Sequence, residues 1–261
     1  MGIINARYIR NKVMLKKVIL KDIVFNNLKH TEFRNFIKTK GYFVFPSAPG
    51  LSSIERDKEY YNALVKSDLV FFDSGFFVLL LRIFKNIRAI KFSGFKFLEI
   101  FFKYLKKNNH LKILCIDPNE KFSISNARFL KNLKVKKVYN YIAPIYNPKK
   151  INDRKLLKLI NEKKPDFILN NLGGGTQEIL ALYLKKKLKV KSTILCTGGA
   201  ISFFTGDQAP INHMIDKFYL GWFVRLIYNP FTFFKRYLLA LRLIKIVFNN
   251  KIKPIHEQKY S

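Results

Sequence analysis

One carboxylate is a clear candidate for acid–base chemistry. Asp73 follows the apolar run at residues 69–72 and directly precedes Ser74 and Gly75, a pattern that predicts a strand ending in a tight turn. At the mouth of a sheet the carboxylate would be partly desolvated, which raises a carboxyl pKa toward the range of a general base. The alternative is a structural role, in which Asp73 caps the following helix by accepting from its backbone N–H groups.

Other polar groups are expected at the same edge of the sheet. In open α/β sheets ligands bind beyond the carboxyl ends of the strands. Three of the five loops expected there carry glycines at strand-to-helix turns, where free backbone N–H groups favour a phosphate-bearing ligand. Glycine can also serve only to make a tight turn, and neither dinucleotide nor P-loop fingerprints are present. The five loops are residues 46–50, 73–75, 117–119, 173–177 and 197–199.

The C-terminal stretch at residues 218–243 combines the only Trp of the chain with many aromatic and basic residues. Past Pro230 polar residues recur at three- to four-residue steps, which places them on one stripe of a helix beside a wide apolar face. Such a helix can pack on a core, lie on an anionic membrane or reach toward a phosphate. The polar positions are Thr232, Lys235, Arg236, Arg242 and Lys245.

Apolar runs alternate with helical patterns up to about residue 205, which predicts an α/β fold with a parallel sheet covered by helices on both faces. Residues 206–261 are predicted to form a helical appendage, because the alternation stops after Phe204. Strands are predicted at residues 17–25, 42–46, 69–72, 112–116, 135–139, 166–170 and 193–196. Helices are predicted at residues 31–39, 52–66, 76–84, 125–131, 153–161 and 177–187, the second opening on a capping box at Ser52 and Glu55.

Composition narrows the class of protein. The 49 Lys and Arg residues against 17 Asp and Glu give a net charge of +32, which implies attraction to nucleic acid, anionic lipid or phosphorylated substrates. An AT-biased genome also enriches lysine and is part of the cause, so the charge alone does not decide the partner. Cys115 and Cys196 lie in apolar runs and are predicted to be buried thiols in a reducing compartment. The four His residues are scattered, so no metal site is expected. No signal peptide or spanning segment is visible, so any membrane contact should be peripheral.

Several blocks, in their order along the chain, resemble the WecG/TagA/CpsF glycosyltransferases (glycosyltransferase family 26). The last block is the most specific, because Trp222, Arg225, Pro230 and the pair Lys235 and Arg236 fall where that family has W, R, P and a basic pair. The resemblance implies a Rossmann-like domain over residues 1–205 and a membrane-associating appendage over residues 206–261 that closes over the donor. The blocks are VILKDIVFNNLKHTEF, ALVKSDLVFFDSG, PDFILNNLGGGTQE, TGGAISFFTG and LGWFVRLIYNPFTFFKRYL.

The resemblance also implies an activity. It indicates an inverting, metal-independent transferase without a cofactor, which moves a hexose-type sugar such as N-acetylmannosamine from a UDP-sugar. The acceptor would be a polyprenyl-diphosphate-linked intermediate of bacterial cell-surface polysaccharide or teichoic-acid-like synthesis. Asp73 occupies the place of the family's proposed base, which would take the proton of the attacking acceptor hydroxyl. The protein would be cytoplasmic, bound peripherally to the inner face of the plasma membrane, and could form oligomers.

The resemblance assigns two further sets of residues. Cations of the appendage would stabilise the charge of the departing diphosphate. Expected donor-binding residues are Ser47, Lys91, Gln177, Gly198, Gly199, Arg225, Lys235 and Arg236. Expected membrane contacts are Trp222, Phe231, Phe234 and Leu238.

Some positions depart from the family pattern and leave two alternatives open. Ser47 lies in a Pro-Ser-Ala stretch where the family commonly has T-P-N, Lys96 and Ser202 replace acids, and Thr232 replaces an arginine. These changes leave the donor sugar open and admit a catalytically inactive, membrane-binding relative. The net charge alone would suggest a nucleic-acid-binding protein, but the aromatic residues lie in apolar runs and are not interleaved with cations. Nucleic acid is therefore not an expected partner.

Overall fold

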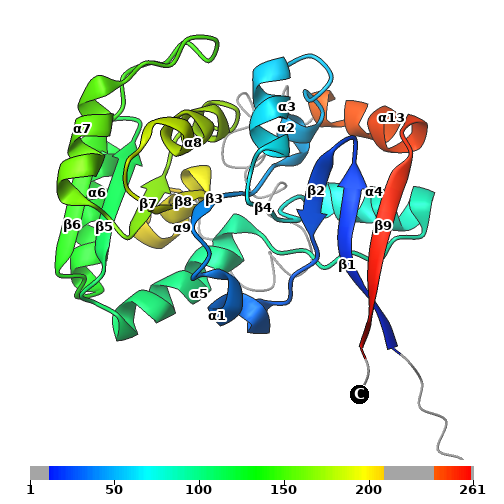
Figure 1. Cartoon of the computed structure of the whole chain (residues 1–261), viewed down its shortest axis with the longest axis horizontal. Coiled ribbons are helices and arrows are strands. Elements are labelled where there is room, and N and C mark those ends of the chain that lie inside the picture. The colour runs from blue at the N-terminus through cyan, green and yellow to red at the C-terminus, as the bar shows by residue number, and fades with distance from the viewer. Residues whose placement is uncertain (1–11, 209–237, 260–261) are drawn as a thin grey trace, which may run out of the picture.

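A sheet with helices on both faces forms the core of the computed structural model, which describes residues 12–208 and 238–259 (Figure 1). The strands are β1 (Lys12–Leu20), β2 (Ile23–Asn26), β3 (Gly41–Val44), β4 (Leu69–Val70), β5 (Lys112–Asp117), β6 (Lys137–Ile142), β7 (Phe167–Asn170), β8 (Thr193–Cys196) and β9 (Ile252–Lys259). Their order in the sheet is β6-β5-β7-β8-β3-β4-β2-β1-β9. Neighbours from β6 to β2 run parallel, whereas β1 is antiparallel to both β2 and β9. The predicted α/β fold is confirmed, with an antiparallel edge added.

From β2 onward, helices or 3-10 turns separate consecutive strands, as expected for parallel neighbours that need crossover connections. They are α1 (Phe33–Phe36), α2 (Ala48–Leu51), α3 (Lys58–Val65), α4 (Gly75–Lys85), α5 (Gly94–Lys107), α6 (Glu120–Asn132), α7 (Arg154–Lys163), α8 (Thr176–Lys187), α9 (Ser202–Thr205) and α13 (Arg242–Asn249), with 3-10 turns η1 (His30–Glu32) and η2 (Gly198–Ile201). No helix within the described residues is long and apolar enough to cross a membrane.

Two apolar clusters lie on opposite faces of the sheet. Alternation along β3 shows this, because Tyr42 and Val44 belong to one cluster and Phe43 and Phe45 to the other. The first cluster includes side chains of α2, α3, α4, α7, α8 and α13, and the second those of α1, α5, α6 and η2. Cys115 and Cys196 are buried free thiols in these clusters, as predicted. The central strands of the sheet are therefore covered on both faces.

The prediction of one strand at residues 17–25 is wrong in one respect. The end of β1 and most of β2 lie there, and the two strands form a hairpin. Lys21, with φ +45°, makes the turn, and Ile23 N–H donates to its carbonyl. The apolar run is nearly continuous in sequence and gives little sign of this reversal. The turn places β1 next to β2, and β9 pairs with the free edge of β1.

The predicted helix at residues 52–66 is two helices. Ser47 caps α2, and the Asp57 carboxylate caps α3 by accepting from Tyr60 N–H at 2.9 Å. Ser52 makes no capping box, because its hydroxyl donates to the carbonyl of Pro49 at 2.7 Å. Helix α5 was not predicted at all. The predicted helical character of residues 206–261 is wrong for residues 252–259, which form β9.

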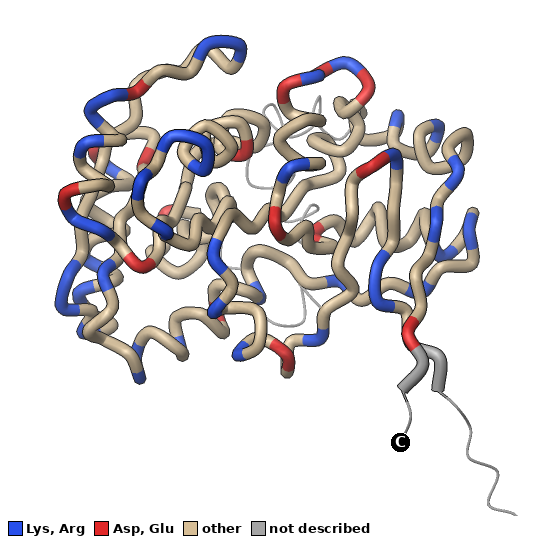
Figure 2. The backbone as a smooth tube through the Cα atoms, in the orientation of Figure 1, with Lys and Arg blue, Asp and Glu red and all other residues tan. Residues whose placement is uncertain are grey.

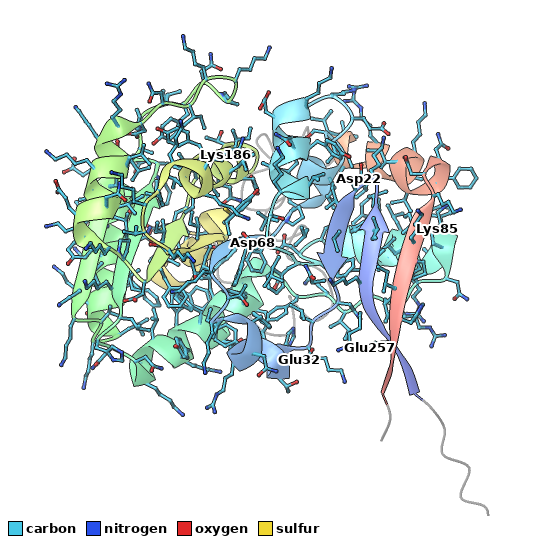
Figure 3. All side chains as sticks on the ribbon, in the orientation of Figure 1. Asp22, Glu32, Asp68, Lys85, Lys186 and Glu257 are labelled. Carbon is cyan, nitrogen blue, oxygen red and sulfur yellow. The ribbon has the colours of Figure 1, made fainter. Side chains whose placement is uncertain are left out.

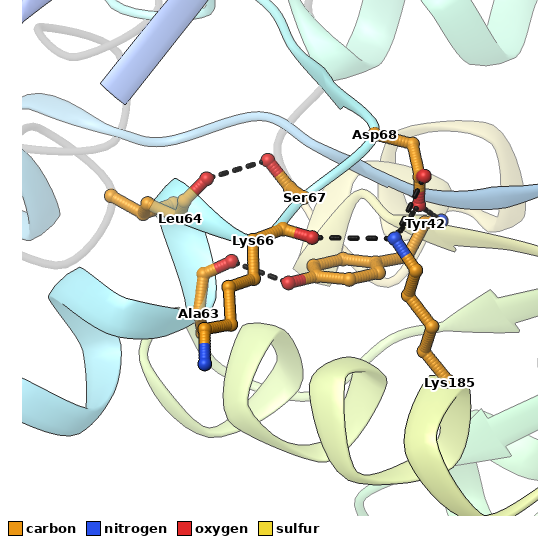
Figure 4. Close-up of polar contacts among 7 residues, drawn as sticks. All are labelled: Tyr42, Ala63, Leu64, Lys66, Ser67, Asp68 and Lys185. Carbon is orange, nitrogen blue, oxygen red and sulfur yellow. Dashed lines mark hydrogen bonds and ion pairs between the residues drawn. The ribbon is translucent and has the colours of Figure 1, made fainter. Parts of the chain in front are cut away.

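An ion pair ties the second half of the chain to the first. The Asp68 carboxylate accepts from Tyr42 N–H at 2.8 Å and pairs with Lys185 Nζ of α8 at 2.7 Å (Figure 4). The Tyr42 hydroxyl donates to the carbonyl of Ala63 in α3 at 2.6 Å. Because these contacts join β3, α3 and α8, they hold together the elements whose ends carry the loops described next.

The cations are spread widely over the described part of the chain. In Figure 2, Lys and Arg lie along the outer helices and loops on every side of the molecule, and Asp and Glu are few. Figure 3 shows their side chains extending outward, with Lys85 beside the C-terminal helix and strand. A charge distributed in this way does not form a single stripe on the described part of the chain.

Candidate active site

A cavity of about 910 Å³ lies at the carboxyl ends of four neighbouring strands, β7, β8, β3 and β4. Loops that follow these strands line it, as expected for an open α/β sheet. Four of the five predicted loops contribute: residues 46–50, 73–75, 173–177 and 197–199. Helix α4, the residues between α4 and α5, and Ala240 and Leu241 also line it.

The fifth predicted loop, residues 117–119, does not line the cavity. It follows β5, which lies beyond β7 on the side away from β8. The Asp117 carboxylate is buried and accepts from the amides of Asn126 and Asn171, each at 2.7 Å. Burial raises the pKa of Asp117 above its ordinary value, although these hydrogen bonds act in the opposite direction. Asp117 is thus part of an internal polar network and not of the cavity.

Asp73 lies in the cavity wall, partly buried, at the turn between β4 and α4. Its Oδ1 accepts a hydrogen bond from the backbone N–H of Gly94, the first residue of α5, at 2.8 Å. The alternative structural role, capping of the following helix, belongs to Ser74, whose hydroxyl accepts from Phe77 N–H at 3.1 Å. The N-terminus of α5 therefore orients Asp73.

A second carboxylate, Glu178, lies in the same wall and is 1% exposed. It accepts from Gly175 N–H at 2.7 Å and from the Gln177 amide at 2.9 Å. Burial raises the pKa of Glu178 to about 7; these hydrogen bonds lower it, and the Asp73 carboxylate raises it further. The cavity therefore holds one carboxyl group that titrates close to neutral pH.

Gln177 connects the two glycine turns at the cavity. Its Nε2 donates to Glu178, and its Oε1 accepts from Gly198 N–H at 2.8 Å. The expectation that glycine-turn N–H groups face an anion is wrong for Gly175 and Gly198, whose N–H groups are bound to these side chains. Both residues have positive φ, +93° and +56°, which explains why glycine occupies both positions.

The other predicted donor-binding residues fall into two groups. Ser47, Lys91, Gln177, Gly198 and Gly199 all line the cavity. The Ser47 hydroxyl also caps α2, accepting from Gly50 N–H at 3.4 Å. The remaining predicted residues, Arg225, Lys235 and Arg236 for the donor and Trp222, Phe231 and Phe234 for the membrane, lie outside the described residues. The predicted membrane residue Leu238 is described and is 52% exposed.

Sequence reasoning missed several residues of this wall. Glu178 could have been found from its place three residues after Gly175 at a helix start, where a carboxylate commonly reaches back to the cap N–H. Gly94 had no signal, because α5 itself was not predicted. Arg82 and Arg88 also line the cavity and bring positive charge to the side formed by α4 and the segment after it. Among the described residues no three His, Cys, Asp or Glu side chains are grouped as metal ligands.

The arrangement combines an oriented carboxylate, a second carboxyl group with a pKa near neutrality and three cations in one largely apolar cavity. A carboxylate in hydrogen-bond reach of a substrate hydroxyl can act as a general base, and cations in a partly desolvated site can stabilise a diphosphate. These are the groups that transfer of a glycosyl residue from a diphosphate leaving group requires. The cations are Arg82, Arg88 and Lys91.

Comparison with known proteins identifies the family. A search of curated proteins gave no match. The family model described as the glycosyl transferase WecG/TagA/CpsF family matches residues 18–256, which span the sheet from β1 to β9 and every loop of the cavity. The chain belongs to the WecG/TagA/CpsF family of glycosyl transferases.

Proposed function

We propose that the chain moves a hexose-type sugar, for example N-acetylmannosamine, from a UDP-sugar to a polyprenyl-diphosphate-linked acceptor, with inversion at the anomeric carbon. Asp73 takes the proton of the acceptor hydroxyl as its oxygen bonds to the anomeric carbon. The bond from that carbon to the donor diphosphate breaks, and the nucleoside diphosphate leaves with the electron pair. The pathway is assembly of a bacterial cell-surface polymer at the inner face of the plasma membrane.

The position of Asp73 supports this proposal most directly. Its carboxylate lies in the cavity wall and accepts from Gly94 N–H at 2.8 Å, while Arg88 and Lys91 line the same cavity. A base and a cationic region in one cavity match the two needs of the reaction, deprotonation of the nucleophile and stabilisation of the leaving diphosphate. The net charge of +32 also favours an anionic membrane surface.

Sugar transfer to a lipid-diphosphate acceptor extract tests the proposal, with a panel of UDP-sugars as donors. We expect Asp73→Asn to lower kcat by roughly 10²- to 10⁴-fold, because the amide cannot accept the proton. The matched control is Asp57→Asn, since asparagine also caps a helix and Asp57 lies outside the cavity wall. Equal rates for the wild type and Asp73→Asn would remove Asp73 as the base, and no transfer from any donor would favour an inactive relative.

Donor binding and metal dependence are measured separately. Isothermal titration of the wild type with UDP should show binding that is unchanged by a chelator, because the proposed reaction uses side-chain cations in place of a metal. Transfer that stops after chelation and returns with a divalent cation would contradict that part of the proposal. Retention of DNA without binding of millimolar UDP would instead favour the nucleic-acid alternative.

A further inference from the structure

Helix α4 has three exposed apolar side chains, and one of them, Phe84, also meets Phe248 of α13. Leu79, Ile83 and Phe84 are 50%, 63% and 40% exposed. Leu79 and Ile83 are four residues apart, so they lie on the same side of the helix. The opposite side is a normal core face, with Phe77 and Leu81 fully buried.

Helix α13 extends this surface. It packs against α4, and Phe84 and Phe248 meet edge to face with ring centroids 5.8 Å apart. The Lys85 ammonium joins the two helices by donating to the carbonyl of Phe248 at 3.1 Å. On α13 and just before it, Leu241, Ile244 and Phe248 are 54%, 37% and 64% exposed. We call these six apolar side chains of the two helices the α4–α13 face.

This face is continuous with the cavity. Leu79 and Leu241 line the cavity and are also about half exposed, so both are accessible to solvent where the cavity opens. Arg82, one turn after Leu79, lines the cavity too and is exposed. An apolar surface therefore runs from the inside of a polar site to solvent, with a cation at the boundary.

Cations surround the apolar residues. Arg82, Arg242 and Lys245 are exposed, and Lys85 lies between the two helices. An exposed apolar surface rimmed by Lys and Arg is the pattern expected of a membrane-facing surface, since the apolar side chains enter the interface and the cations meet anionic head groups. The overall charge of +32 has the matching sign.

We propose that the α4–α13 face rests on an anionic bilayer and admits the lipid-linked acceptor to the cavity, with Arg82 binding the acceptor diphosphate at the mouth. The proposal rests on the proposed function, because it locates the acceptor of that reaction. Arg82 is seven residues after Gly75, the first residue of α4, which separates it from the Asp73 end by about 10 Å along the helix axis. A sugar ring can lie in that interval between the base and the diphosphate.

Vesicle flotation tests whether the α4–α13 face binds a bilayer and whether Arg82 binds the acceptor diphosphate, and it does not require sugar transfer. Vesicles of phosphatidylglycerol and phosphatidylcholine are prepared with and without undecaprenyl diphosphate. We expect the wild type to float with both, and more with those that contain undecaprenyl diphosphate. Leu79→Ser/Ile83→Ser should lower partitioning to both by roughly tenfold or more, because two apolar side chains lose their burial in lipid. The matched control is Ile124→Ser/Ile145→Ser, which removes two exposed isoleucines from elsewhere on the surface.

A second variant tests the cation. Arg82→Gln should abolish the extra binding to vesicles with undecaprenyl diphosphate and weaken binding to plain vesicles only as far as the loss of one rim cation does. Arg128→Gln, at an exposed position of α6, should change neither. If Leu79→Ser/Ile83→Ser floats with vesicles as the wild type does, the α4–α13 face is not a membrane-binding surface. The same holds if the only effect of this variant is to convert an oligomer of the chain to monomers. If Arg82→Gln still binds more strongly to vesicles that contain undecaprenyl diphosphate than to plain vesicles, Arg82 does not bind the acceptor diphosphate. If the wild type binds these vesicles but transfers no sugar, only the proposed function fails.

Discussion

The Asp73 carboxylate accepts a hydrogen bond from the backbone N–H of Gly94, with 2.8 Å between Oδ1 and N. This bond joins the turn after β4 to the first residue of α5, 21 residues later. The first backbone N–H groups of a helix have no partner within the helix, so a carboxylate can accept from them. The proposed base is therefore oriented by an element outside its own turn, and that element can be altered without touching Asp73.

Replacing Gly94 tests this orientation. Gly94→Pro removes the N–H that Asp73 accepts, whereas proline is tolerated at the first position of a helix and the extended backbone of Ser93 suits a residue before proline. We expect transfer to fall by roughly tenfold, as for one lost hydrogen bond to a charged group of about 1.5 kcal/mol. Steady-state kinetics of sugar transfer measure this effect.

Gly94→Ala is the control, because it keeps the N–H. A Cβ there would meet Ala200 and Phe45 at 3.7 Å, an ordinary contact distance. This variant should keep near wild-type rates. If Gly94→Ala and Gly94→Pro lose activity equally, the hydrogen bond is not what matters at this position.

Glu178 should make stability depend on pH near neutrality. Its pKa is raised from 4.5 to about 7 in the folded protein, mainly by burial, so the folded state binds a proton more tightly than the unfolded state. Its stabilising contribution is therefore fully present below pH 4.5 and is lost as the pH rises through about 7. A difference of about 2.5 pKa units corresponds to about 3 kcal/mol.

Urea unfolding of the wild type and Glu178→Gln at several pH values measures this contribution. The free energy of unfolding of the wild type, relative to Glu178→Gln, should decline between pH 5 and pH 8. Subtracting the variant removes the contributions of the other titrating groups. A difference that stays constant over this range would show that Glu178 titrates at its ordinary pKa.

Gly41 is required by the Asp68 contact. It has φ +125°, and a Cβ there would lie 2.0 Å from Asp68 Oδ2, the atom that accepts from Tyr42 N–H. We expect Gly41→Ala to lower the free energy of unfolding by roughly 1–3 kcal/mol, through backbone strain and displacement of Asp68. Gly173→Ala is the control, since its Cβ would meet nothing within 4 Å. Equal unfolding midpoints for the two variants would contradict this explanation.

Strand β9 should be needed for a soluble fold. It pairs with β1 from Lys12–Lys259 to Leu20–Ile252, so a chain without residues 251–261 leaves an unpaired edge strand. We expect lower soluble yield, a lower thermal midpoint and concentration-dependent aggregation, followed by circular dichroism and light scattering. A chain that lacks only residues 260–261 keeps all of β9 and should behave as the wild type. A shortened chain that stays monomeric with an unchanged midpoint would show that β9 is dispensable.

Much of the fold and the cavity could be predicted from the sequence. The strands at residues 112–116, 166–170 and 193–196 and the helices at residues 76–84 and 177–187 agree with β5, β7, β8, α4 and α8 to within about one residue at most ends. The reason is local, because continuous apolar runs bounded by glycine, proline and polar residues define buried parallel strands. Parallel strands also bring their carboxyl ends to one edge, so Asp73, Gln177 and Gly198 could be expected at one site.

Only the tertiary structure decided the hydrogen-bond partners and the solvation of these residues. Gly94 N–H meets Asp73, Gly198 N–H is bound by Gln177, and β9 completes the edge next to β1, each through contacts between segments far apart in sequence. The pKa of Glu178 depends on complete burial next to Asp73, which no spacing of residues reveals. The sequence determined which groups reach the carboxyl edge of the sheet. Packing determined their hydrogen-bond partners, their solvation and hence their charge, because these depend on atoms that only the folded chain brings together.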